Sequence, residues 1–211
     1  MWNLVLRVSP CWQCGKPVAE ALFCPNCNAL QPPPADYYRL LGIKEDQLNV
    51  NADDLQGRFY ELSRLLHPDR FMRKPEIERQ YSLDAASVLN DAYRTLRDPV
   101  KRALYVLKKH GFEIGEQKSK DVPPELLEEV FELNMALEEM RAGDDSARPQ
   151  LESAEQNFSS MLQDSGTELE SQFAAYDAAP GNEKLMQIRA VLNRRKYIQN
   201  LVNQVHEHLS N

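Results

Sequence analysis

Glycine and long apolar runs are scarce in this sequence. Only 8 of its 211 residues are glycine, and no apolar run approaches the roughly 18 residues that a membrane-spanning helix needs. It has no glycine-rich phosphate-binding loop and no serine nucleophile elbow. The apolar start, residues 1–8, is too short for the core of a secretory signal peptide. These absences argue against a membrane protein and leave a globular chain with 42% hydrophobic residues.

Positive charge is also in the minority. The chain has 25 lysines and arginines against 32 acidic residues, and its net charge is −7. This balance argues against general nucleic-acid binding, because phosphate contacts need clustered cations. Residues 58–74 are a local exception, with five cationic side chains against two acidic ones. A basic patch in an acidic chain predicts a charged partner, either an acidic protein surface or a phosphate backbone.

Changes in periodicity divide the chain into three predicted domains. Residues 1–31 contain all four cysteines and little helical periodicity, and the prolines that follow form a stiff spacer. Residues 36–111 show helical patterns that are interrupted at Pro68 and Pro99. Residues 122–211 contain three long amphipathic stretches, separated by short breaks rich in Gly, Asp and Pro.

Three long helices with short connections predict an antiparallel bundle. The sequence therefore predicts an all-α fold, in which a helical hairpin domain and a three-helix bundle follow a small cysteine module. A polar connection over residues 112–122 joins the last two parts. The long helices are expected at about residues 52–66, 76–97, 99–110, 125–142, 149–178 and 183–209.

The four cysteines have the spacing of a metal site. Cys11 and Cys14 form one C-x-x-C pair, and Cys24 and Cys27 form a second pair after nine intervening residues. Four thiolates in two such knuckles supply the tetrahedral ligands of structural zinc, so the sequence predicts a zinc-ribbon-like module with one zinc ion. Because four cysteines fill the coordination sphere, hydrolytic chemistry at this ion is not expected.

Two other interpretations of the cysteines stay open. Two disulfides would use the same residues but would require an oxidising compartment, which nothing else in the sequence indicates. A mononuclear iron site is the sharper alternative, because CWQCG and CPNCN resemble rubredoxin knuckles. The chain would then be a redox protein, and its colour would decide, since a zinc protein is colourless and a ferric tetrathiolate is red.

A His-Pro-Asp tripeptide follows the helix expected over residues 52–66. Pro68 cannot donate a helical hydrogen bond and disfavours the helical conformation at His67, so the helix ends there. His67 and Asp69 are therefore expected at a loop tip inside the basic patch. They could form a catalytic pair, but no other part of an active site accompanies them. The sequence favours a protein contact at this tip and predicts that the chain is not an enzyme.

The segments around this tripeptide resemble a J domain, the module that stimulates ATP hydrolysis by DnaK-type heat-shock chaperones. The resemblance covers about residues 36–110. The matching segments are DYYRLLG at 36–42, LLHPD at 65–69 and NDAYRTLRDPVKRALY at 90–105.

In a J domain the His-Pro-Asp loop triggers the ATPase and the basic helix before it docks on the chaperone. The resemblance implies that His67, Pro68 and Asp69 are the trigger, and that Arg64 and Arg70 are docking residues. The basic patch would then steer the domain onto an acidic chaperone surface.

The whole chain after the first ten residues is similar to the HscB family of iron–sulfur cluster co-chaperones, in which a J domain precedes a three-helix bundle. The family partners are a DnaK-type chaperone and a cluster scaffold protein. The cysteine module is similar to that of eukaryotic mitochondrial members, which implies residence in the mitochondrial matrix, with the cytoplasm as the alternative. The matching segments are CWQC, FCPNC, HGFEI at 110–114 and ELNMALEEM at 132–140.

Apolar residues outside the core stripes of the bundle suggest a binding surface. On the first bundle helix, Leu127, Phe131 and Met135 lie off the predicted stripe, and Tyr197 lies off the stripe of the last helix. The family resemblance assigns Leu127, Phe131 and Tyr197 to scaffold binding. These side chains could instead pack on another part of the chain or be singly exposed. The predicted stripes are Leu126, Val130, Leu133, Leu137 and Met140, and Ile188, Val191, Ile198, Val202, Val205 and Leu209.

Three questions stay open at the sequence level. The zinc module could contact a partner, or could stabilise the fold and pair two subunits into a homodimer. The client could be a protein other than an iron–sulfur scaffold. The first acidic residue is Glu20, which is compatible with the remnant of a targeting leader.

Overall fold

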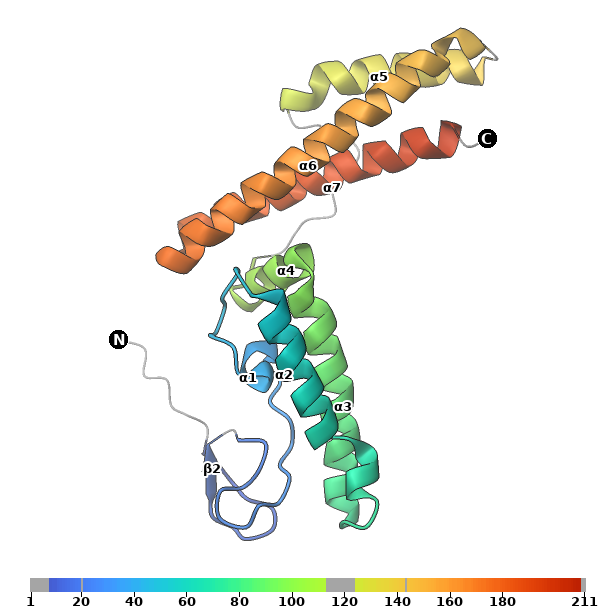
Figure 1. Cartoon of the computed structure of the whole chain (residues 1–211). Helices are drawn as coiled ribbons and strands as arrows, with labels where there is room; N and C mark the ends of the chain where they lie inside the picture. Colours follow the sequence, from blue (N-terminus) through green and yellow to red (C-terminus); the bar gives the residue numbers. More distant parts are fainter. Residues whose placement is uncertain (1–7, 20, 113–123, 143, 210–211) are drawn as a thin grey trace. The chain divides into compact units, whose positions relative to one another are not determined.

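The computed structural model describes residues 8–19, 21–112, 124–142 and 144–209 (Figure 1). Residues 1–7 and 20 of the predicted cysteine domain, most of the predicted connection, and residues 122, 123, 143, 210 and 211 of the predicted bundle lie outside this range. The chain forms two compact units, Met1–Tyr105 and Val106–Asn211. Among the described residues, none of the helices has the length and apolar character to cross a bilayer.

The first unit begins with the cysteine module, whose regular structure is one small hairpin. Strands β1 (Val8–Pro10) and β2 (Pro17–Ala19) pair antiparallel, with Ser9 opposite Val18. The core cluster of the module is small, with Cys11, Val18, Cys24 and Ala29 as its buried members. So small a core is typical of a domain that needs a metal for stability.

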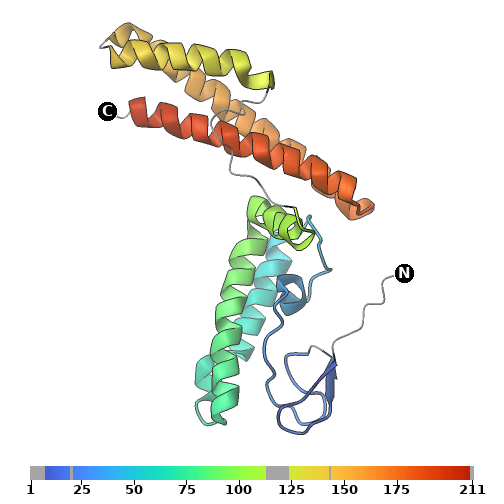
Figure 2. The ribbon, with the colours of Figure 1, turned by 180° about the vertical axis from the view of Figure 1, so that it is seen from behind.

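Helices α1 (Tyr37–Leu41), α2 (Ala52–Leu65) and α3 (Glu76–Arg97) make up the rest of the first unit, together with the start of α4 (Pro99–Lys109). Figures 1 and 2 show α2 beside α3, and both α1 and α2 pack on α3. The polypeptide between α2 and α3 includes the short 3₁₀ helix η1 (Pro68–Phe71).

Polar side chains fix where these helices begin. Asp36 accepts a hydrogen bond from the backbone of Arg39 at α1, and Asn51 accepts two from the first turn of α2. Asp98 accepts from the backbone N–H groups of Val100 and Lys101 at α4, as expected of an Asp before a helical proline. Because short polar side chains satisfy the free N–H groups of a first turn, these positions set the helix boundaries.

The second unit consists mainly of three long helices, α5 (Leu127–Arg141), α6 (Arg148–Ala178) and α7 (Asn182–Leu209). The 3₁₀ turns η2 (Pro124–Leu126) and η3 (Asp145–Ala147) precede α5 and α6. Figure 2 shows α6 and α7 side by side as a hairpin, and α5 packs on α6. The predicted all-α fold class, with a helical hairpin and a three-helix bundle, is confirmed.

One expectation about the bundle is wrong. Tyr197 was expected to lie off the core stripe of its helix, but it is 8% exposed and belongs to the core formed by α5, α6 and α7. It forms a second buried row with Leu201, one turn later, beside the row of Ile198 and Val205. A helix that faces a broad core buries more than one narrow stripe, and the apolar ring of tyrosine is readily accommodated there.

Candidate metal centre and partner-binding surfaces

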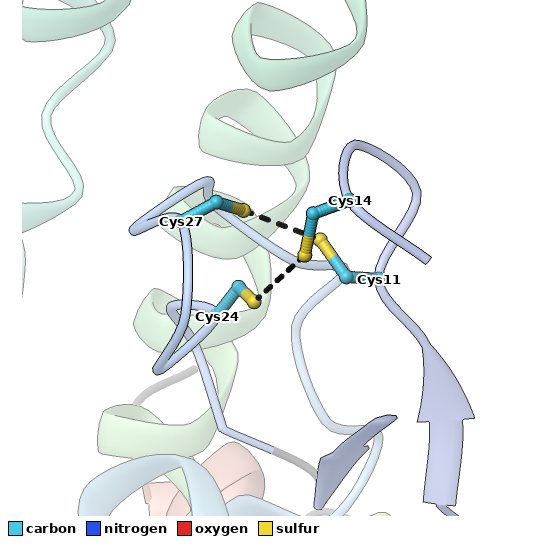
Figure 3. A group of neighbouring side chains, drawn as sticks. All are labelled: Cys11, Cys14, Cys24 and Cys27. Atoms are coloured by element: carbon cyan, nitrogen blue, oxygen red, sulfur yellow. Dashed lines mark hydrogen bonds between the residues drawn. The ribbon is translucent and has the colours of Figure 1, made fainter. Parts of the chain in front are cut away.

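The four cysteine sulfurs converge on one point between the two knuckles (Figure 3). The Sγ atoms of Cys11 and Cys27 are 3.6 Å apart, those of Cys14 and Cys24 are 3.7 Å apart, and all four lie within 4.8 Å of one another. Ligands at about 2.3 Å from a tetrahedral zinc ion are about 3.8 Å apart, so the thiols fit a metal ion. All four cysteines are free, at separations too long for disulfide bonds.

The backbone of each knuckle turns through a left-handed residue. Gly15 has φ 70° and donates its N–H to the carbonyl of Cys11, and Asn28 has φ 58° and donates to the carbonyl of Cys24. Glycine and asparagine adopt this conformation at little cost. These two residues therefore let each knuckle close around its pair of thiols.

The local environment gives the thiols different affinities for protons. At Cys11, burial raises the pKa, but hydrogen bonds from the backbone of Cys14 and Gln13 and from neighbouring thiols outweigh it and lower the pKa to about 6. At Cys27, the backbone of Ala29 lowers the pKa, but burial and the other three thiols raise it to about 12. The module therefore favours thiolate at Cys11 first, and a cation is needed to ionise the whole set.

Two amide side chains near the sulfurs were missed at the sequence level. The buried Gln31 donates from Nε2 to Cys11 Sγ at 3.4 Å, and Asn26 donates from Nδ2 to Cys14 Sγ at 3.5 Å. Gln31 is the last residue of the predicted cysteine domain, and its place four residues after Cys27 is the only sequence signal for this contact. Such donors stabilise negative charge on thiolate ligands.

The His-Pro-Asp loop is an exposed tip between two buried anchors. Leu66 and Phe71 are buried on either side of it, whereas the side chains of His67 and Asp69 are 59% and 78% exposed. The Nδ1 atom of His67 accepts from the backbone N–H of Asp69, and the His67 carbonyl accepts from the N–H of Arg70. The loop therefore presents an imidazole and a carboxylate in a defined turn.

The side chains of the basic patch differ in whether they contact the rest of the domain or the solvent. Arg58 donates from Nη1 to the carbonyls of Gly42 at 2.8 Å and Leu41 at 3.3 Å, so it caps the end of α1. Arg64 and Arg70 are exposed on either side of the loop tip. These two side chains are available to an acidic partner, whereas Arg58 mainly stabilises the domain.

The outer face of α5 is apolar where a bundle helix is usually polar. Leu127 and Met135 are exposed, and Phe131 is 67% exposed. Phe131 and Met135 line a groove between α5 and α6 together with Glu132 and Glu139. The buried Tyr197 does not contribute an exposed ring to this face, and burial raises its pKa. An apolar strip with acidic edges has the character of a protein-binding surface.

Comparison with known families identifies both helical parts. The family model described as "DnaJ domain" matches residues 36–105, and the one described as "HSCB C-terminal oligomerisation domain" matches residues 122–206. Neither match includes the four cysteines. The predicted domain boundaries, including that of the cysteine domain, stay a prediction.

Named relatives extend this likeness along the chain. The human "Iron-sulfur cluster co-chaperone protein HscB" is 38% identical over 149 residues, covering 68% of this chain and 62% of the relative. The Arabidopsis thaliana "Iron-sulfur cluster co-chaperone protein HscB homolog" is 33% identical over 160 residues, covering 75% of this chain and 62% of the relative. The chain thus matches about three fifths of the length of these relatives.

Two solved structures share the architecture. The crystal structure of human co-chaperone protein HscB superposes with a TM-score of 0.67 at 29% identity, and covers 93% of this chain and 96% of that one. Chaperone HscB from Vibrio cholerae gives a TM-score of 0.54 at 26% identity, with 82% and 96% covered.

Proposed function

Because this chain belongs to the HscB family of iron–sulfur cluster co-chaperones, we propose that it carries a cluster scaffold protein to a DnaK-type chaperone and accelerates ATP hydrolysis there. Two exposed surfaces would bind the two partners. The loop tip around His67 and Asp69 would trigger the ATPase, and the apolar face of α5 would hold the scaffold. The chain itself would perform no chemistry.

The exposed loop tip is the observation that carries this proposal. The Asp69 carboxylate is exposed to solvent, and so are Arg64 and Arg70, which lie before and after the tripeptide in the sequence. Arginines on an exposed rim accelerate encounter with an acidic surface, and a carboxylate that becomes desolvated on docking can pair with a cation of the chaperone. Pro68 would fix the separation of His67 and Asp69 by restricting the backbone.

Scaffold binding is assigned to Leu127 and Phe131 on α5. Both side chains are exposed and lie four residues apart, so they form one ridge that a partner can cover. The family resemblance also assigns Tyr197, but this ring is buried. We assign to Tyr197 an indirect part in this surface, through support of the core beneath it.

The remaining assignments follow from the family and from the cysteine geometry. We propose that the four cysteines hold one structural zinc ion, with the iron site of a redox protein as the alternative. Residence in the mitochondrial matrix is proposed on the likeness of the cysteine module to mitochondrial members, with the cytoplasm as the alternative. Neither a nucleic acid nor a membrane is among the proposed partners, and homodimer formation is a further property to test.

Calorimetric titration of a purified iron–sulfur scaffold protein into the full chain tests the client assignment. We expect saturable binding by the wild type and a loss of at least tenfold in affinity for Leu127→Ala with Phe131→Ala, since hot-spot truncations cost about 2 kcal/mol or more. Met186→Ala is the matched control, because Met186 is also an exposed apolar residue but lies on α7. It should bind like the wild type.

The outcomes of this titration separate two functions. Absence of heat with the wild type would remove the iron–sulfur scaffold as client, and a J protein with another client would take its place. Equal binding by the double variant and the wild type would move the binding surface away from α5. Helical content measured by circular dichroism must be unchanged for either comparison to count.

A further inference from the structure

Two buried polar side chains on α3 have no part in the proposed surfaces. Glu78 is 4% exposed and Ser82 is fully buried, and they lie one turn apart on the same face of the helix. Burial of a carboxylate or a hydroxyl is unfavourable unless it is hydrogen-bonded. What each side chain contacts therefore indicates why it is there.

Glu78 connects α3 to the cysteine module. Its Oε2 atom accepts a hydrogen bond from the backbone N–H of Leu30, which is buried, at 3.4 Å. The carbonyl of the same Leu30 accepts from the indole N–H of Trp12 at 2.7 Å. Trp12 lies within the first knuckle and Leu30 follows the second, so the folded module holds Leu30 through the Trp12 hydrogen bond and through the chain itself.

Ser82 connects α3 to the start of the trigger loop. Its hydroxyl donates to the carbonyl of Leu66 at 2.7 Å, and Leu66 is the residue before His67. Carbonyl groups at the end of a helix lack a helical partner, so this hydrogen bond fixes the point at which α2 gives way to the loop. A cleft of about 300 Å³ is lined by Phe23 of the module, by Arg70 and by Glu78. The module therefore also lies close to the residues that follow the His-Pro-Asp tripeptide.

The first turn of α3 depends on this connection. Pro75 precedes the helix and offers no side-chain cap, in contrast to the residues before α1 and α2. The acceptor for this turn is the carbonyl of Pro75, which accepts from the N–H groups of Glu78 and Arg79. Glu78 lies in this turn and is held through the module. If the module lost its metal, its small core would not hold Leu30 in place, and the turn between Glu78 and Ser82 would loosen.

We propose that Glu78 and Ser82 are positioning residues that couple the metal-loaded cysteine module to the His67–Asp69 trigger. Occupancy of the four-cysteine site would thereby set how rigidly the trigger is presented. The inference rests on the proposed function only for the role of the loop as a trigger. The coupling itself is a property of the chain.

Amide hydrogen exchange of the full chain, with zinc and after chelation under reducing conditions, measures this coupling. The reporters are the N–H groups of Leu66 and Arg70, which donate to the carbonyls of Leu62 and His67. On zinc removal we expect their exchange to accelerate about fivefold, the effect of losing roughly one hydrogen bond, relative to amides of α6. Equal exchange in the two states would overturn the proposal.

Substitutions of Glu78 and Ser82 test the path. Glu78→Leu removes the acceptor and should give fast exchange at both reporters even with zinc bound, with no further response to chelation. Glu78→Gln keeps an acceptor oxygen and should behave like the wild type. Glu76→Leu changes an exposed carboxylate in the same turn and is the matched control. Ser82→Ala should accelerate the reporters while the module keeps its zinc.

The results distinguish this coupling from the proposed function. A response of Glu78→Leu no larger than that of Glu76→Leu would overturn the coupling, as would slow exchange in Ser82→Ala. If Glu78→Leu loses helical content, the coupling is tested instead by the exchange of Ser82→Ala and by the response of the wild type to zinc removal. A zinc-loaded wild type that fails to stimulate a DnaK-type ATPase would refute the trigger assignment and leave the exchange result standing.

Discussion

At the residue scale, exposure separates side chains that a partner can reach from those that hold the fold. His67 and Asp69 are exposed but fixed between the buried Leu66 and Phe71. Phe131 lies on the surface of α5, whereas Tyr197 lies in the core of the same bundle. Substitutions at these positions should therefore divide into those that change binding and those that change stability.

His67→Gln should abolish ATPase stimulation and leave the fold intact. The imidazole is exposed, and its hydrogen bond to the N–H of Asp69 is local, so we expect the free energy of unfolding to change by less than about 0.5 kcal/mol. Single-turnover ATP hydrolysis by a DnaK-type chaperone measures the stimulation, and urea unfolding measures the stability. Full stimulation by the variant would place the trigger elsewhere.

Tyr197→Ala should destabilise the bundle, in contrast to Phe131→Ala. Truncating a buried aromatic residue leaves a cavity, with a cost of about 3–5 kcal/mol, whereas truncating an exposed one costs less than about 0.5 kcal/mol. Tyr197→Phe retains the buried ring and should lose much less. Chemical denaturation of the three variants provides the measurement, and a stable Tyr197→Ala variant would contradict the assigned core position.

The same residues show where sequence reasoning succeeds. The cysteine spacing specifies the ligand set, because only four thiols are present and their pairs must face one another. Leu127 and Phe131 follow from helical periodicity, because α5 presents one face to the core. Tyr197 could not be placed in this way, since the width of the buried stripe depends on how many neighbours a helix contacts.

At the scale of elements, helix boundaries depend on single capping side chains. The start of α4 was predictable, because Asp98 before Pro99 is a strong local signal and the aspartate caps as expected. The dependence of α3 on the cysteine module was not predictable from sequence. Glu78 and Leu30 are far apart in the chain, and a hydrogen bond to a backbone N–H leaves no mark in the identity of the residue that donates it.

Asp144 should make the stability of the bundle depend on pH. Hydrogen bonds from the hydroxyl and the backbone N–H of Ser146 lower the pKa of the Asp144 carboxyl below its ordinary value. A carboxyl with a lowered folded-state pKa contributes stability above its unfolded pKa of about 3.9, and this contribution is lost as the pH falls through the folded pKa.

Asp144→Asn tests this dependence, because the amide keeps an acceptor oxygen but does not titrate. Thermal unfolding between pH 6 and pH 2 should show the wild type as the more stable protein at the upper end, with the difference shrinking at the lower end. A difference that stays constant over this range would show that the charge of Asp144 has no effect on the bundle.

At the scale of the whole molecule, the cysteine module and the helical bundle differ in the size of their apolar cores. The core cluster of the module has four small buried side chains, whereas the bundle has an extensive apolar core. Stability should therefore be distributed unevenly along the chain.

Removal of the metal should unfold the cysteine module and leave most of the helical structure in place. Metal analysis and visible absorbance of the purified protein identify the ion first, and we expect one zinc per chain and no colour. After chelation, limited proteolysis should cut within residues 8–31 while circular dichroism keeps nearly all its helical signal. A red protein would establish iron and favour the redox alternative.

The fold class was predictable because long periodic helices and two cysteine pairs leave few architectures to consider. The hydrogen bonds that join the cysteine module to the helical hairpin were not predictable, because they form between segments that are far apart in the sequence.

The junction at Leu30 uses its N–H and its carbonyl, so replacing its side chain does not remove either hydrogen bond. An alanine scan would pass over this position or report only lost packing. Because Leu30 is buried, other apolar amino acids could replace it without breaking the connection, but proline could not, because it lacks the N–H. The link thus depends on the path of the main chain at position 30 and not on the identity of the side chain there.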